Sequence, residues 1–188
     1  MILFINACVR DESRTKILAD HLLSKLDDTV TEERLSDLNF PVGDEDFLYM
    51  RDHLINSGNF SHPLFKSAQQ FASADTIVIA APYWDLSFPA SLKHYLEQIN
   101  VVGITFRYSD DGVPVGLCKA KSLYYVTTAG GFYTPSEYGF GYVKELAQSF
   151  YGIPDVELIQ ASGLDINGAD VNEILLECQH RIDKLFIC

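Results

Sequence analysis

The segment A-A-P-Y-W-D-L-S-F-P, residues 80–89, follows the apolar run Thr76-Ile77-Val78-Ile79 and precedes a helical pattern. An ordinary turn from a strand to a helix needs only a bend and a cap, but this one combines prolines, aromatic residues and an acid. The prolines restrict the backbone, and Tyr83 and Trp84 offer flat surfaces beside amides that a turn leaves unpaired. The segment is therefore either an aromatic edge of the core or one wall of a ligand site.

Five runs of apolar and β-branched residues predict the strands of a sheet. Four of them are almost continuously apolar, which is typical of strands that are covered on both faces. The second run is more polar and fits an edge strand. The predicted strands are Ile2 to Ala7, Val30 to Leu35, Thr76 to Ala81, Ser122 to Thr128 and Val156 to Ala161.

Helical patterns separate the predicted strands. We expect Ser13 to cap a helix whose apolar stripe holds Ile17, Leu18, Leu22 and Leu26. Further helices are expected at Pro63 to Ser73, Ala90 to Ile99, Ser136 to Phe150 and Ala169 to Phe186. The segment from Leu38 to His62 contains proline, glycine and an acidic cluster without a clear period, which predicts a surface excursion with a short helix in it.

The alternation of strands and helices predicts an α/β fold with a doubly wound parallel sheet and helices on both faces. For five strands we expect the flavodoxin-like order 2-1-3-4-5. Ligands of such folds bind at the carboxyl ends of the strands, around the switch between strands 1 and 3. The length of 188 residues suits a single domain, residues 1–188.

The composition argues against several classes of protein and site. The net charge of −12 opposes binding to nucleic acid or anionic membranes through a general basic surface. No apolar run approaches the roughly 18 to 20 residues of a membrane helix, and residues 1–6 lack a basic leader, so we expect a soluble, cytoplasmic protein. The cysteines at positions 8, 118, 178 and 188 form no C-x-x-C pair, which argues against a metal site or a redox dithiol.

The first predicted strand runs into residues 6–16, N-A-C-V-R-D-E-S-R-T-K, which match neither G-x-G-x-x-G nor G-x-x-x-x-G-K-[ST]. This turn places the hydroxyls of Ser13 and Thr15, with Arg10 and Arg14, at the free amides of a helix start. Such an end attracts a phosphate through the helix dipole and through its unpaired donors. The alternative is an ordinary serine cap beside solvated arginines.

The fourth predicted strand ends in T-T-A-G-G-F-Y, residues 127–133. Paired glycines after a strand allow the backbone to approach a ligand closely, although they also suit a tight turn. The predicted fold brings the turns after strands 1, 3 and 4 to one crevice. Together they offer parts for a phosphate and for a flat ring, which points to flavin mononucleotide (FMN).

Further motifs follow one another along nearly the whole chain. They are residues 81–89 (A-P-Y-W-D-L-S-F-P), 92–97 (L-K-H-Y-L-E), 103–108 (G-I-T-F-R-Y), 128–131 (T-A-G-G) and 150–153 (F-Y-G-I). In this order they resemble the FMN-dependent NADH azoreductase and quinone reductase family of the flavodoxin-like fold. The family's G-x-T-F-[RK]-Y segment is matched nearly letter for letter by residues 103–108.

The resemblance implies where FMN binds. In the family the first loop holds the phosphate, the turn after the third strand packs against the isoalloxazine ring and donates backbone amides, and the glycine turn borders the ring's other side. The family forms homodimers with the flavin at the subunit interface, where Tyr108 and Phe150 are expected to line the substrate cleft, with core packing as the alternative. The expected cofactor-binding residues are Arg10, Ser13, Thr15, Tyr83, Trp84, Asp85, Leu86, Thr128, Ala129, Gly130, Gly131 and Tyr133.

Two positions depart from the family pattern. Asp85 replaces the usual asparagine, and an ionised carboxylate there would lower the potential of the flavin by disfavouring its anionic reduced form. Alternatively, the Asp85 side chain points away and caps the following helix. Thr15 stands where the family usually has a second serine, and Arg10 is expected to compensate in phosphate binding.

The resemblance also implies an enzyme in which FMN supplies the chemistry, so we expect no catalytic side chain and no metal. NADH or NADPH is the expected electron donor, and a quinone, an azo compound or a similar flat acceptor then takes two electrons in a ping-pong cycle. No residue of a Rossmann fingerprint marks the donor's ribose, so both donors remain candidates.

Three alternatives stand beside this prediction. The first is an FMN reductase of the same superfamily. The second is an electron carrier, which the acidic surface favours and the lack of a T-x-T-G-x-T-like phosphate loop opposes. The third is a flavin-free regulatory protein.

Overall fold

A five-stranded parallel sheet forms the centre of the computed structural model, which describes residues 1–187. Its order is β2-β1-β3-β6-β7, which confirms the predicted order 2-1-3-4-5. The strands are β1 (Ile2–Asn6), β2 (Val30–Arg34), β3 (Thr76–Ala80), β6 (Ser122–Thr128) and β7 (Asp155–Ala161). The more polar β2 lies at an edge, as its sequence predicts.

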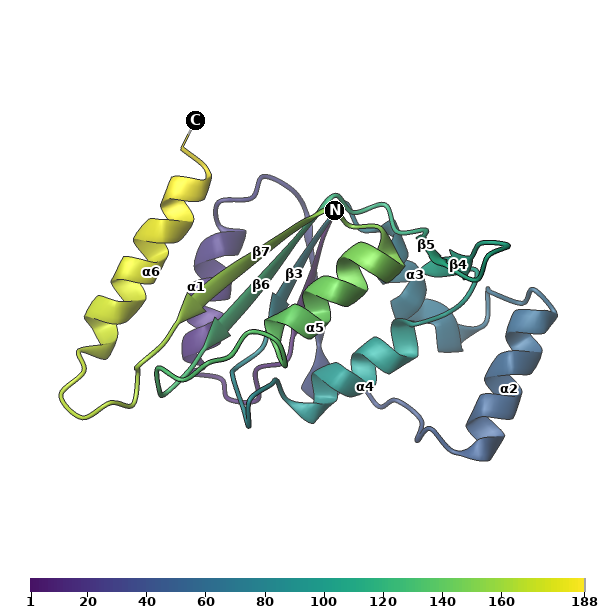
Figure 1. Ribbon diagram of the computed structural model, residues 1–188, viewed down its shortest axis with the longest axis horizontal. Helices are drawn as coiled ribbons and strands as arrows, with labels where there is room; N and C mark the ends of the chain where they lie inside the picture. Colours follow the sequence, from purple (N-terminus) through teal and green to yellow (C-terminus); the bar gives the residue numbers. More distant parts are fainter. Residues whose placement is uncertain (188) are drawn as a thin grey trace.

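Helices cover both faces of the sheet (Figure 1). On one face α1 packs beside α6, and on the other lie α3, α4 and α5. The helices are α1 (Arg14–Leu23), α2 (Glu45–Asn56), α3 (Lys66–Ser73), α4 (Ala90–Ile99), α5 (Phe140–Glu145) and α6 (Val171–Leu185). Short 3₁₀ turns η1 (Leu35–Asp37) and η2 (Pro63–Phe65) join them, and a π-helical turn η3 (Leu146–Tyr151) follows α5.

The two sides of the sheet bury two separate cores. Because successive side chains of a strand point to opposite faces, Leu3 and Ile5 of β1 pack in the core under α3 and α4, and Ile2 and Phe4 pack in the core under α1 and α6. All four of these side chains are at most 2% exposed. This double burial explains why β1 reads as an uninterrupted apolar run.

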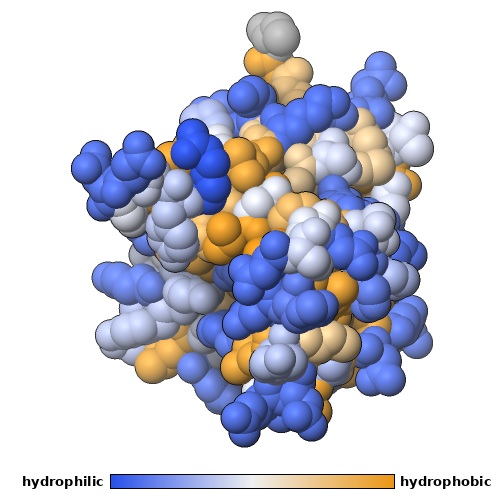
Figure 2. All heavy atoms as spheres, turned by 90° about the vertical axis from the view of Figure 1, so that its right-hand side faces the viewer, coloured by the Kyte–Doolittle hydropathy of each residue, from blue (hydrophilic) through white to orange (hydrophobic). Residues whose placement is uncertain are grey.

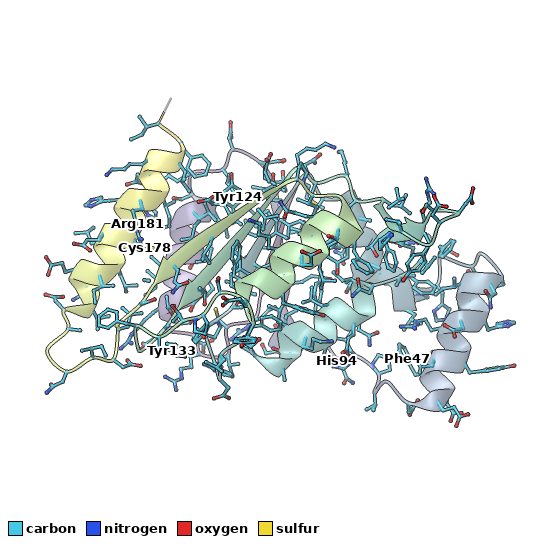
Figure 3. All side chains as sticks on the ribbon, viewed as in Figure 1. Phe47, His94, Tyr124, Tyr133, Cys178 and Arg181 are labelled. Atoms are coloured by element: carbon cyan, nitrogen blue, oxygen red, sulfur yellow. The ribbon has the colours of Figure 1, made fainter. Side chains whose placement is uncertain are left out.

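Some local predictions were wrong. Ile17 is 45% exposed instead of lying on the buried stripe of α1, because that stripe is formed by Leu18, Ala19 and Leu22. The helix predicted from Ser136 begins at Phe140 and widens into η3 at Leu146. The predicted surface excursion after β2 does contain a helix, α2, but at 12 residues it is longer than expected, and only Phe47 of it is buried (Figure 3).

A two-stranded antiparallel hairpin, β4 (Phe106–Tyr108) with β5 (Pro114–Gly116), was not predicted as strands. It follows α4 and packs against η3. Gly116 allows this approach, because a Cβ atom there would lie 2.2 Å from the backbone carbon of Tyr151. The hairpin lies on the side of the molecule near α3, far from the carboxyl ends of the main sheet (Figure 1).

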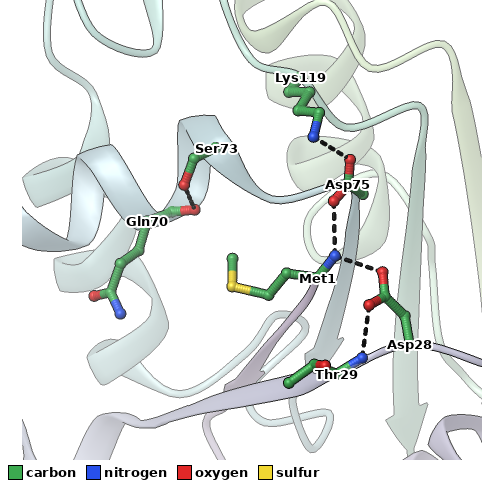
Figure 4. A network of polar contacts seen from close by, with 7 residues as sticks. All are labelled: Met1, Asp28, Thr29, Gln70, Ser73, Asp75 and Lys119. Carbon is green, nitrogen blue, oxygen red and sulfur yellow. Dashed lines mark hydrogen bonds and ion pairs between the residues drawn. The ribbon is translucent and has the colours of Figure 1, made fainter.

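A polar network ties the amino ends of three strands together (Figure 4). The Met1 ammonium group binds Asp28, which precedes β2, and lies 2.7 Å from Asp75 Oδ2, which precedes β3. Lys119 Nζ lies 2.6 Å from Asp75 Oδ1. The hydrogen bond from Lys119, and then that from the ammonium group, lower the pKa of Asp75 to about 2. This network holds the end of the sheet opposite the crevice described next.

Candidate functional site

A cavity of about 500 Å³ opens at the carboxyl ends of β1, β3 and β6. It lies at the switch point of the sheet, where the strand order changes direction and ligands of doubly wound folds bind. The cavity brings together the three turns that the sequence analysis selected, and it adds the loop after β7. Its lining residues are Val9, Arg10, Glu12, Ser13, Arg14, Thr15, Pro82, Tyr83, Trp84, Thr128, Ala129, Gly130, Leu164 and Asp165.

The start of α1 forms one end of the cavity. Ser13 caps the helix, as predicted, with its Oγ accepting a hydrogen bond from the Lys16 amide at 3.4 Å. Among residues 1–187, the amides of Arg14 and Thr15 have no hydrogen-bond acceptor. They point out of the positive end of the helix, so they are available to an anion.

Thr15 and Thr128 connect this helix to the end of β6. Their hydroxyl oxygens lie 2.6 Å apart, and the two residues are 0% and 8% exposed. One hydroxyl donates to the other, which leaves a single hydroxyl hydrogen for any further partner. The Thr15 hydroxyl therefore does not stand free in the cavity, because it shares a hydrogen bond with the cavity wall.

The turn after β3 is a tight hairpin between Trp84 and Ser87. The Trp84 amide donates to the Ser87 carbonyl at 3.1 Å, and the Ser87 amide donates back at 2.7 Å. Its two central residues have positive φ, 49° at Asp85 and 68° at Leu86, without being glycine. Non-glycine residues in this region cost about 1 kcal/mol or more each, and such strain concentrates at functional sites.

This geometry reduces the number of backbone amides between Tyr83 and Leu86 that are free to bind a flavin. The Tyr83 amide donates to the Thr128 carbonyl at 3.0 Å, and the Trp84 amide is used in the hairpin, so neither is free. Within the described part of the chain, the amides of Asp85 and Leu86 have no acceptor. The hairpin therefore has two adjacent free donors instead of four, and their residues, Asp85 and Leu86, lie beside the cavity without lining it.

The side chain of Asp85 does not cap the following helix. Pro89 is the N-cap residue of α4, and it makes no side-chain capping bond. The capping alternative for Asp85 is therefore wrong, and no hydrogen bond of its carboxylate is present within residues 1–187. The Ser87 hydroxyl ties the hairpin to the loop before α5 by donating to the Tyr138 carbonyl at 3.0 Å.

Two aromatic residues of this turn line the cavity. Trp84 is 45% exposed, and Tyr83 is half-buried. The Tyr83 hydroxyl oxygen is buried without a partner among the described residues, and burial raises the pKa of Tyr83. A buried hydroxyl without a partner is costly, and because this oxygen is not accessible from the cavity, it offers a bound ligand no contact.

The glycine turn after β6 is paired with the loop after β7. The amides of Gly163, Leu164 and Asp165 donate to the carbonyls of Gly131, Ala129 and Gly130 at 3.0 to 3.2 Å. Sequence reasoning missed Leu164 and Asp165, although they follow the fifth strand and its carboxyl end meets the same edge of the sheet. Their position could have indicated them, because the turn after the fifth strand lies at the same edge of the sheet as the turns after strands 1, 3 and 4.

Tyr133 lies outside the cavity. Its side chain is 80% exposed, beyond the carboxyl end of β6 (Figure 3). Gly131 does not line the cavity either. Its carbonyl accepts a hydrogen bond from the Gly163 amide, which holds the loop after β7 in place. Of the two glycines, only Gly130 lines the cavity.

Tyr108 and Phe150 lie together but far from this cavity. Phe106 of the hairpin stacks edge-on against both, with ring centroids 5.4 Å from Tyr108 and 5.0 Å from Phe150. Neither residue lines the cavity. Tyr108, Val113 and Leu117 are exposed on this hairpin and the segment after it. Apolar surface is also visible on this side of the molecule (Figure 2).

A second cavity of about 650 Å³ lies along the edge strand β2. Its charged residues largely pair with one another or with neighbours, as Arg34 does with Asp11 at 2.7 Å and Asn6 with Glu32 at 2.8 Å. It is lined by no aromatic residue. The cavity at the switch point therefore suits a flat ligand better.

The switch-point cavity fits FMN. It combines free amides at the start of a ten-residue helix with the aromatic surface of Tyr83 and Trp84, and the two free amides of the strained hairpin follow directly after Trp84, beside the cavity. Its volume lies within the range of small-molecule sites. No three histidine, cysteine or acidic side chains within residues 1–187 are arranged to hold a metal ion. No helix in that range is long and apolar enough to cross a membrane.

Comparisons with known proteins agree with this geometry. The model of a family described by its flavodoxin-like fold matches residues 1–186. An FMN-dependent NADH:quinone oxidoreductase of Clostridium beijerinckii is 38% identical over 192 residues, which cover 97% of this chain and 94% of that protein. The crystal structure of an azoreductase from Bacillus anthracis Sterne has a TM-score of 0.84 at 25% identity, covering 98% and 97% of the two chains. An FMN-dependent NADH-azoreductase from B. anthracis Ames Ancestor, solved in complex with FMN, has a TM-score of 0.81 at 25% identity and the same coverage.

Proposed function

The chain belongs to the flavodoxin-like family of FMN-dependent NADH:quinone oxidoreductases, and from this premise we propose that it passes two electrons from NADH to a quinone or an azo compound. The observation that carries the proposal is the switch-point cavity, which offers free amides at the start of α1 and the aromatic surface of Tyr83 and Trp84, with two more free amides in the hairpin beside it. When bound, FMN supplies the two-electron chemistry, through hydride transfer at N5. The protein's own part is to bind, orient and shield the reactants.

The start of α1 holds the phosphate. The free amides of Arg14 and Thr15 and the Ser13 hydroxyl hydrogen donate to its oxygens, assisted by the helix dipole. Arg10 is exposed at the cavity rim and adds positive charge. These local donors are needed because the chain carries a net charge of −12, which repels an anion at longer range.

The hairpin after β3 holds the ring. Trp84 and Tyr83 line the cavity and would provide flat surface, and the free amides of Asp85 and Leu86 beside the cavity would donate to acceptor atoms at the ring's polar edge. Donors fixed in place before the reaction stabilise negative charge on that edge without reorganisation. Asp85 acts through its backbone, and its side chain carries no role in the proposal.

Substrate contacts from Tyr108 and Phe150 require a second copy of the chain. Both residues lie in the aromatic cluster of the β4–β5 hairpin, away from the cavity of their own chain. In a homodimer that sets this cluster against the partner's cavity, the two side chains cover the exposed face of the ring and select flat acceptors. The exposed apolar side chains around the cluster support such an interface.

A cytoplasmic location completes the proposal. Cys8, Cys118 and Cys178 are free thiols, which suits a reducing compartment. Burial raises the pKa of Cys118 to about 12, so this thiol stays protonated and unreactive.

Initial-rate kinetics test the function. With FMN-saturated protein, NADH oxidation is measured against varied NADH at several fixed concentrations of a benzoquinone and, separately, of methyl red. Parallel double-reciprocal lines are expected, because donor and acceptor occupy the same face of the ring in turn. A rate no greater than that of free FMN would contradict the proposal, and a preference for free flavin as acceptor would assign an FMN reductase.

A further inference from the structure

We propose that Asp165 is a positioning residue that holds the Arg14 guanidinium ready for the FMN phosphate. The proposal rests on the proposed function only in taking FMN as the ligand. It concerns two residues at the rim of the same cavity, contributed by the first turn of α1 and by the loop after β7.

The hydrogen bonds of Arg14 use only one of its nitrogen atoms. Arg14 Nη1 lies 2.7 Å from Asp165 Oδ1 and 3.4 Å from the Leu164 carbonyl oxygen. Among residues 1–187, Nε and Nη2 have no acceptor. These two nitrogens form a side of the planar guanidinium that can bind two oxygens of one phosphate, so Arg14 can hold Asp165 and the phosphate at the same time.

Asp165 is fixed by its backbone and by its neighbour Gly130. The Asp165 amide donates to the Gly130 carbonyl at 3.0 Å. A Cβ atom at position 130 would lie 2.3 Å from Asp165 Oδ2 and 3.0 Å from its Cγ, so the carboxylate occupies the space that glycine leaves. The absent side chain of Gly130 therefore makes room for the acid that orients Arg14.

The charges of the cavity explain why orientation matters. Arg10 and Arg14 face two acids, Glu12 and Asp165, so the charged side chains that line the cavity sum to zero. A phosphate gains little from such a balanced set unless one cation is aimed at it. The Arg14 and Asp165 side chains are 40% and 69% exposed, and ion pairs this exposed add little to folding stability. Positioning therefore accounts for the pair better than stability does.

The test compares the affinities of FMN and riboflavin, which lacks the phosphate, measured by the change in flavin fluorescence on titration with protein. Asp165→Asn is expected to raise the Kd for FMN roughly tenfold, the equivalent of one charge-assisted hydrogen bond, and to leave the Kd for riboflavin unchanged. In an Arg14→Gln background, Asp165→Asn is expected to add no further loss, because the residue it positions is gone.

Glu12→Gln is the matched control. It removes one negative charge from the same cavity without touching Arg14, and equal or tighter FMN binding is expected. The flavin-free Asp165→Asn protein is expected to melt within about 2 °C of wild type, which separates positioning from folding.

Three results would overturn the inference: an equal loss of riboflavin affinity, an unchanged FMN Kd, or tighter FMN binding by Asp165→Asn, which would mean that Asp165 competes with the phosphate. All three leave the proposed function standing if wild-type protein binds FMN. A wild-type protein that binds neither flavin would overturn both.

Discussion

Replacing Thr15 with valine removes half of a buried pair of hydroxyls without changing the shape of the side chain. Thr15 and Thr128 share one hydrogen bond of 2.6 Å and are 0% and 8% exposed, so the pair is largely shielded from water although both residues line the cavity. A buried polar group left without its partner costs about 1 to 3 kcal/mol. Thr15→Val is therefore expected to destabilise the flavin-free protein by that amount, and Thr128→Val similarly.

The double variant Thr15→Val/Thr128→Val is the decisive one. It replaces both partners with apolar groups, which is expected to be nearly neutral because no orphaned hydroxyl remains. The assay is urea unfolding of the flavin-free proteins, with thermal unfolding as a second readout. For a chain of 188 residues, each kcal/mol corresponds to roughly 2 to 4 °C in Tm.

Thr127→Val, one position earlier in β6, is the matched control. The Thr127 hydroxyl is buried without a partner among the described residues, so its removal is expected to leave stability unchanged or to raise it. The reasoning would be refuted if the Thr15 and Thr128 single variants were as stable as wild type. It would also be refuted if the double variant lost the sum of the two single losses.

Further predictions concern the sheet, the hairpin and the interface. Asp75, whose pKa is lowered to about 2, contributes stability that is complete above its ordinary pKa of 3.8 and is lost as the pH falls through 2. Asp75→Asn should therefore lower the urea midpoint at pH 7 but not near pH 2, and an equal deficit at both would contradict this. Leu86→Gly should stabilise the flavin-free protein by up to about 1 kcal/mol in urea unfolding, because glycine adopts positive φ without strain; a loss would show that the Leu86 side chain matters more. Tyr108→Ala and Phe150→Ala should each lower kcat/KM for the acceptor several-fold while FMN affinity stays unchanged, and weaker FMN binding in either would argue against a role confined to substrate.

Much of the fold could be predicted because the buried strands leave a strong pattern. Residues 2–5 of β1 are covered on both faces, so they read as continuous apolar sequence. The length of helix α2 was underestimated, because only Phe47 of its 12 residues is buried and the helix therefore shows almost no apolar periodicity. The β4–β5 hairpin was missed because its strands have three residues each, too few to show an alternation.

The site was predictable as three turns but not in its details. Strand order alone places the turns after β1, β3 and β6 together, so the cavity's location follows from sequence. The sequence does not predict that the Tyr83 and Trp84 amides bond within the protein. These bonds depend on a hairpin formed by non-glycine residues with positive φ. The pairing of Asp165 with Arg14 joins residues 151 positions apart, and no local pattern signals it.

The most direct test of the central claim is the visible spectrum of purified protein after FMN is added and excess flavin is removed, followed by anaerobic addition of NADH in the same cuvette. We predict flavin absorption that survives the washing and bleaches promptly with NADH. A colourless protein, or bound flavin that NADH fails to reduce, would contradict the account.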